Sequence, residues 1–71
     1  MYEKARKFCY REFKMCRLFG CDVEQAITRC YGVIMFVLSI ESDRIKNNEL
    51  SMWWDDEMLP YFRKLARDRK K

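Results

Sequence analysis

Four cysteines, at positions 9, 16, 21 and 30, are the side chains best suited to chemistry in this 71-residue sequence. Zinc sites usually take their ligands from closely spaced Cys or His pairs, but the sequence has no CxxC pair and no histidine. In a helix, Cys9 and Cys16 would be separated by about 10 Å along the axis, which is too far for a disulfide. We therefore expect reduced, mostly buried cysteines with no metal or cofactor, which favours a cytoplasmic setting.

A catalytic role would require one of these thiols to act as a nucleophile, activated by a neighbouring base or cation. Cys21 is the best placed, because it precedes a predicted helix whose dipole would lower its pKa. The sequence offers no histidine as a base, no glycine-rich loop and no paired ligand residues. We therefore predict no catalytic residue and expect a protein that is not an enzyme.

Basic side chains are concentrated at the two ends of the sequence, which has a net charge of +4. Residues 1–17 and 63–71 each hold six Lys or Arg, whereas residues 18–62 hold three against eight acidic side chains. On a helix, four of the N-terminal cations form one stripe that could contact nucleic-acid phosphates: Lys4, Lys7, Arg11 and Lys14. The alternative is charge complementarity between the helices of one domain.

Residues 2–19 have the period of an amphipathic helix, with apolar side chains on one side and basic ones on the other. Gly20 follows the last periodic position, where a left-handed residue often ends a helix. Glu12 falls on the apolar side. Because burying a lone carboxylate is costly, we expect Glu12 either to reach solvent at an edge or to meet a basic partner from another helix or subunit.

Asp22 is placed to cap a second helix, which the periodicity extends from Val23 to about Lys46. Segment 16–32, CRLFGCDVEQAITRCYG, resembles a helix-turn-helix in its order of helix, glycine turn and capped helix. In that interpretation Gln25 and Arg29 would read bases. Against it, the second helix is long for a recognition helix and turns apolar after Arg29.

A third helix is expected from near Glu49, after a break at Asn47 and Asn48. It should be kinked or split at Pro60, because proline cannot donate a backbone hydrogen bond. Residues 67–71 form a basic tail that we expect to be frayed. The sequence therefore predicts an all-α fold, a small three-helix bundle that forms a single domain over residues 1–71.

Residues 30–40, CYGVIMFVLSI, form the most apolar stretch. It is shorter than the ~20 apolar residues of a membrane-spanning helix, so we expect no membrane span. One side of this stretch should pack inside the bundle. The other side has nothing to cover it, and the third helix adds one more apolar residue off its own core side. These four residues are Met35, Phe36, Ile40 and Trp53. Exposed apolar surface of this kind usually marks a binding site.

These features predict a small, non-enzymatic protein-interaction module: an adaptor, an inhibitor or a dimeric regulatory subunit. Its partner would be another protein or a second copy of the chain, bound through the second helix. The alternative is a nucleic-acid-binding protein that uses the helix-turn-helix-like segment or the basic face. No small-molecule substrate is expected.

Overall fold

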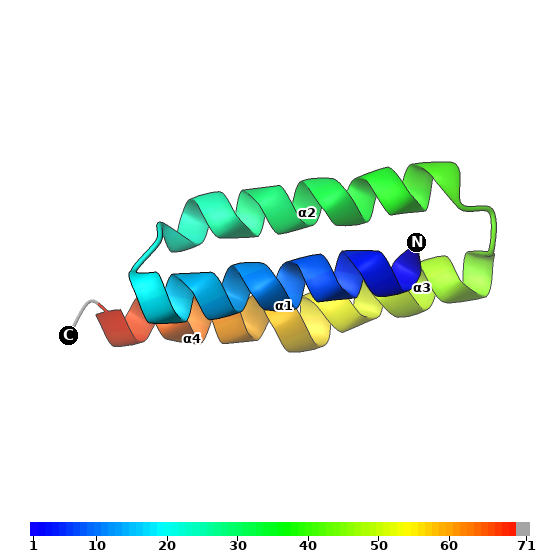
Figure 1. Ribbon diagram of the computed structural model, residues 1–71. Helices are drawn as coiled ribbons and strands as arrows, with labels where there is room; N and C mark the ends of the chain where they lie inside the picture. Colours follow the sequence, from blue (N-terminus) through cyan, green and yellow to red (C-terminus); the bar gives the residue numbers. More distant parts are fainter. Residues whose placement is uncertain (70–71) are drawn as a thin grey trace.

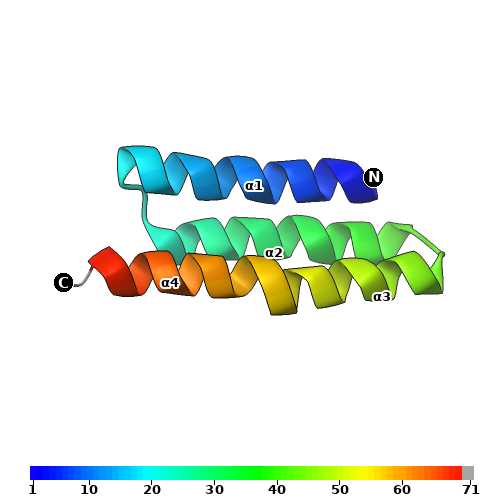
Figure 2. The ribbon, with the colours of Figure 1, turned by 90° about the horizontal axis from the view of Figure 1, so that it is seen from below.

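The computed structural model describes residues 1–69, which form helices and no strands (Figure 1). Helix α1 spans Tyr2–Phe19 and helix α2 spans Val23–Ile40. A third, longer helix consists of α3 (Arg44–Trp53), the π-helical segment η1 (Trp54–Met58) and α4 (Leu59–Arg69). The three helices lie side by side along a molecule of 42 × 18 × 15 Å (Figures 1 and 2). The predicted all-α three-helix bundle is confirmed.

The turn between α1 and α2 has the residues that the sequence indicated. Gly20 adopts a left-handed conformation, with φ of 73°, and its N–H donates to the Cys16 carbonyl at 3.0 Å. Asp22 accepts a hydrogen bond of 2.9 Å from the backbone N–H of Glu24 and so caps α2. Because glycine reaches this conformation without a steric penalty, the chain reverses within three residues and α1 and α2 become neighbours.

The predicted end of the second helix is wrong, because α2 ends at Ile40 rather than near Lys46. Glu41 is extended, with φ of −92° and ψ of 140°. Asp43 then caps α3 by accepting a 3.1 Å hydrogen bond from the Lys46 backbone N–H. Asn47 lies inside α3 and its side chain donates to the Glu41 carbonyl at 3.0 Å. An N-cap aspartate outweighed the apolar periodicity, and the predicted break at Asn47 and Asn48 does not exist.

The interruption of the third helix lies just before Pro60. In η1 the helix widens, so that the backbone N–H of Leu59 donates to the Trp54 carbonyl, five residues back. In a regular α-helix the proline ring would clash with the carbonyl of Asp56. The wide turn accommodates the proline, and the helix continues as α4 with Phe62 buried in the core and Leu65 and Ala66 packed against it.

The core is built from small side chains between α1 and α2 and from large ones on the third helix. Cys9, Cys16 and Cys30 are fully buried. The third helix contributes Leu50, Met58 and Phe62, also fully buried. All four cysteines are free. Buried thiols of this kind act as small apolar groups, which lets α1 and α2 pack closely against each other.

Trp53 belongs to this core and not to an exposed surface, which corrects its predicted role at an interface. Only 8% of it is exposed. The Tyr10 ring meets it edge to face, with 5.5 Å between ring centroids, and the Arg6 guanidinium lies 5.4 Å from its ring. These two residues of α1 cover the indole, so Trp53 joins α1 to the third helix.

The basic tail was expected to be frayed from residue 67, but α4 continues to Arg69. The Arg69 guanidinium donates hydrogen bonds to the backbone carbonyls of Cys16 and Cys21. A cation at the C-terminus of α1 is favoured by the helix dipole. Residues 70 and 71 lie outside the described residues.

Candidate partner-binding groove

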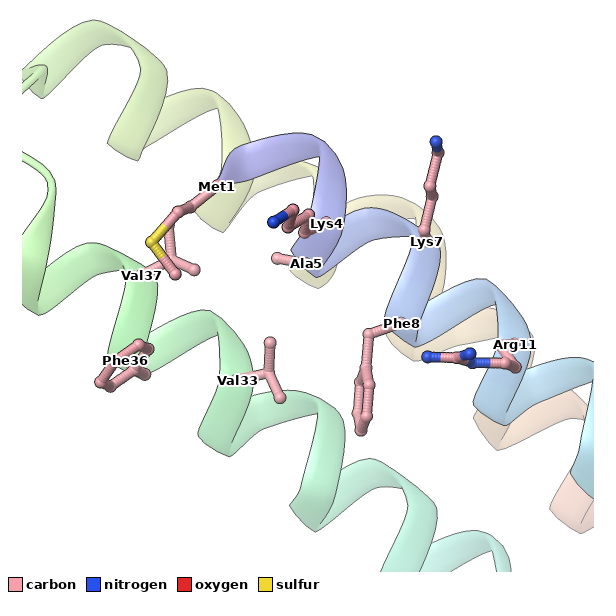
Figure 3. Close-up of a pocket in the computed structure, with 9 residues that line it drawn as sticks. All are labelled: Met1, Lys4, Ala5, Lys7, Phe8, Arg11, Val33, Phe36 and Val37. Atoms are coloured by element: carbon pink, nitrogen blue, oxygen red, sulfur yellow. The ribbon is translucent and has the colours of Figure 1, made fainter.

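A groove of about 520 Å³ lies between α1 and α2, on the side away from the third helix (Figure 3). Its apolar residues come from both helices, and its cations come from α1 alone. The lining residues are Met1, Lys4, Ala5, Lys7, Phe8, Arg11, Val33, Phe36 and Val37. The groove combines an apolar floor with three cations.

Helical spacing explains why these residues meet. Ala5 and Phe8 lie three residues apart on the side of α1 that faces α2, and Val33 and Val37 lie four apart on the facing side of α2. Phe8 extends from α1 toward α2 in Figure 3. Because Ala5 contributes only a methyl group between Met1 and Phe8, the two helices leave a hollow at this level.

The cations of the groove have no acidic partner in the part of the chain described here. Among residues 1–69 one ion pair is present, between Glu12 and Arg29, so Lys4, Lys7 and Arg11 are unpaired within that range. No carboxylate lines the groove. In Figure 3 the Arg11 side chain extends along the groove near Phe8, whereas Lys7 points outward. The α1 wall of the groove is therefore positively charged.

The apolar surface continues from the groove along α2. Phe36 lines the groove and is 56% exposed, while Met35 and Ile40 beside it are 46% and 50% exposed. The structure thus places three of the four predicted interface residues on the surface of α2 and buries the fourth, Trp53. It also brings Phe36 together with Lys4, Lys7 and Arg11, which the sequence had suggested for a separate role.

No protein-family model, curated protein or solved structure matches this chain.

The other predicted nucleic-acid contacts lie apart from the groove. Lys14 is exposed on α1, beyond the groove lining. Gln25 and Arg29 border a shallow depression of about 310 Å³ on α2. The Arg29 guanidinium is already engaged by the Glu12 carboxylate, at 3.0 and 3.1 Å. Moreover, α1 and α2 run side by side as an αα-hairpin (Figure 1), unlike the crossed pair of a helix-turn-helix.

Two of the buried thiols, Cys16 and Cys30, have raised pKa values, which favour the neutral form. A hydrogen bond with the Cys9 thiol, together with burial, raises the pKa of Cys30. Burial, followed by the neighbouring Cys21, raises the pKa of Cys16. The Cys21 thiol points to the Met15 carbonyl, 3.9 Å away. Among residues 1–69, no three His, Cys, Asp or Glu side chains are grouped so that they could hold a metal ion.

Helix α2 differs from the expectation that its apolar stretch is too short to cross a membrane. With 18 residues and a mean hydropathy of 1.3, it is long and apolar enough to cross a membrane by length and composition alone. The core helices of soluble proteins meet the same criteria. Here 28% of its residues are buried within the bundle. Three more apolar residues, Ile27, Val33 and Leu38, pack against the core, while Tyr31, Met35, Phe36 and Ile40 are exposed.

The groove itself was missed at the level of sequence. The sequence pattern placed the apolar side chains of residues 2–19 on one side and the cations on a separate stripe. The available signal was the short spacing between Lys4, Phe8 and Arg11, which puts a large apolar side chain and two cations within two helical turns.

Proposed function

We propose that this protein is a small, non-enzymatic interaction module that binds another protein, or a second copy of itself, through the outer surface of α2 and the α1–α2 groove. The observation that carries this proposal is the exposure of Phe36, which lies at the centre of the surface. A phenylalanine on a helix of a small bundle is normally buried in the core. Here it is 56% exposed and lies between the groove and the exposed side chains of Met35 and Ile40.

A partner that covers this surface would gain free energy of binding from the burial of apolar side chains. Complete burial of an exposed Phe or Ile side chain contributes about 1.5–3 kcal/mol. Because Phe36 and Ile40 are 56% and 50% exposed, covering what remains of each would contribute about half of that amount. Aromatic residues and Met are also the side chains that interfaces favour.

The non-enzymatic part of the proposal is supported by two of the four thiols, Cys16 and Cys30. Nucleophilic cysteines have a lowered pKa, whereas the pKa values of Cys16 and Cys30 are raised. Free thiols also persist best in a reducing compartment. We therefore propose a cytoplasmic adaptor, inhibitor or dimeric regulatory subunit.

The experiment compares the wild-type protein with the double variant Phe36→Glu, Ile40→Lys. Molar mass in solution and the yield of co-purifying protein are measured, and far-UV circular dichroism checks the fold. Ile45→Lys is the matched control, because Ile45 is 73% exposed but lies on α3, away from the groove. The proposal expects the double variant to remain folded and lose association, with the control unchanged.

Two outcomes contradict the proposal. If the double variant unfolds as a monomer, Phe36 and Ile40 are part of the core. If association is unchanged in the folded double variant, the surface of α2 is not the binding surface.

A second candidate function is supported by one observation, the unpaired cations of α1. Lys4, Lys7, Arg11 and Lys14 are exposed and form no ion pair with residues 1–69. A cationic stripe of this kind contacts phosphates without reading sequence. Nucleic-acid binding through this face would be weak and sensitive to salt.

A further inference from the structure

We propose that the α1–α2 groove binds an amphipathic α-helix of a partner protein, with the carboxylates of that helix facing Lys4, Lys7 and Arg11. This inference rests on the proposed function and names the class of partner. A helix in the groove would contact α1 and α2 on the side away from the third helix. It would convert the three-helix bundle into a four-helix arrangement, which is a common way to bury such a face.

The shape of the groove fits a helix. The groove extends along α1 from Met1 to Arg11, which is about 15 Å at the rise of an α-helix. Its apolar residues repeat at three or four positions on both walls. A partner helix with apolar residues at i, i+3 or i+4, and i+7 would place that stripe between the two walls.

The charge of the groove selects an acidic partner. All three cations are on α1, and no carboxylate lines either wall. The α2 wall offers Val33, Phe36 and Val37. An occupant is therefore expected to carry acidic residues along the flank that faces α1 and apolar residues toward α2. Charges at the rim of an interface determine orientation and partner choice more than total affinity.

A second copy of the chain fits this groove poorly. A two-fold symmetric dimer places the same patch against itself. Lys4, Lys7 and Arg11 of the two copies would then face one another. No carboxylate in the lining would offset their repulsion, and like charges across an interface disfavour association.

A membrane surface also fits less well, because of the position of the apolar side chains. An interfacial helix presents a protruding apolar face to the lipid. In the groove, Ala5 and Val37 are almost completely buried, at 1% and 2% exposed, and form a floor between two helices. Such a floor receives side chains that project from a partner.

The test uses the full chain, labelled with ¹⁵N, and a synthetic helical peptide of about four turns. The peptide has Leu at the apolar positions and Glu along one flank, and the matched peptide has Lys in place of each Glu. Vesicles of phosphatidylserine form a third arm. We expect the Glu peptide to bind and to shift the amide signals of residues 4–11 and 33–37, with weaker binding of the Lys peptide.

Charge reversal tests the role of the cations. The variant Lys4→Glu, Lys7→Glu, Arg11→Glu should bind the Glu peptide about tenfold more weakly or worse, and should prefer the Lys peptide. The matched control, Arg63→Glu, Lys64→Glu, Arg67→Glu, makes the same charge change on α4 and should keep the preference for the Glu peptide. If circular dichroism shows that the first variant is unfolded, Arg11→Glu alone replaces it.

The inference is overturned if neither peptide binds, if both bind equally, or if the chain binds the vesicles but not the Glu peptide. It is also overturned, with the proposed function intact, if the chain dimerises in a Phe36-dependent manner while the Glu peptide leaves residues 4–11 unaffected.

Discussion

Glu12 on α1 and Arg29 on α2 are joined by two hydrogen bonds, at 3.1 Å from Nε to Oε1 and 3.0 Å from Nη2 to Oε2. The glutamate side chain is 19% exposed and that of the arginine 45%. The hydrogen bond to Glu12 raises the pKa of Arg29. Of the two alternatives that the sequence left open for Glu12, the structure shows the basic partner on another helix. Arg29 therefore holds α1 against α2.

This pair predicts that Arg29→Lys and Glu12→Gln each lower the free energy of unfolding, because a lysine or an amide cannot reproduce the two charge-assisted hydrogen bonds. The double variant should lose less than the two single losses added together. Urea unfolding of the four proteins measures this. Additive losses would show that the two side chains are not coupled.

Two glycines give a matched test of the turn. Gly20→Ala should destabilise the protein by about 1 kcal/mol, because an alanine is strained at the φ of 73° that Gly20 adopts. Gly32 lies within α2, where an added methyl group would meet no atom within 4 Å. Gly32→Ala should therefore stabilise the protein by about 0.5–1 kcal/mol. Thermal unfolding measures both changes in stability. Equal effects of the same sign would contradict a left-handed Gly20 and a helical Gly32.

Trp53 and Phe36 should respond in opposite ways to truncation. Trp53→Ala removes an indole packed under Tyr10 and Arg6 and should cost about 3–5 kcal/mol of stability. Phe36→Ala should cost less than about 1 kcal/mol, because the ring is exposed. Urea unfolding of the two variants measures whether Trp53 and Phe36 belong to the core. A large loss for Phe36→Ala would place the ring inside the bundle.

Much of the fold could be predicted from local signals. The apolar period of residues 2–19, Gly20 and Asp22 define α1, its end and the start of α2. The boundary between α2 and α3 could not be predicted from periodicity, because Ile45 continues the apolar pattern and yet is 73% exposed. The competing signal was Asp43, whose side chain caps α3.

The candidate site was predicted only in part. Phe36, Met35 and Ile40 could be identified from the two apolar sides of α2. Trp53 was misplaced because an aromatic and a cationic residue of α1, Tyr10 and Arg6, cover it. The groove depends on how α1 and α2 are rotated against each other, which the sequence of neither helix determines alone.

Differences in burial predict different thiol reactivities. Cys9, Cys16 and Cys30 are buried in the native protein, and Cys21 is partly exposed. We expect one cysteine to react rapidly with a thiol reagent under native conditions, and all four after unfolding in urea. Mass spectrometry counts and locates the modified residues. Rapid native modification of Cys9 or Cys30 would contradict their place in the core.

Binding of nucleic acid, if measured with a single-stranded DNA oligonucleotide, should weaken steeply as salt increases, because phosphate contacts release counterions. Lys4→Ala, Lys7→Ala and Lys14→Ala should each lower the affinity and reduce the salt dependence. Gln25→Ala, which leaves the cationic face intact, is the control and should change neither. A sequence-specific complex that resists salt and depends on Gln25 would contradict the basic-face interpretation.

The central claim is that the outer surface of α2 and the groove form the binding surface. Chemical-shift mapping tests it most directly. Spectra of the labelled chain are compared between the free state and the associated state, formed with a second copy or with a co-purifying protein. We predict that the largest changes occur at residues 4–11 and 33–40. Changes confined to α3 and α4, with Phe36 and Ile40 unaffected, would contradict the claim.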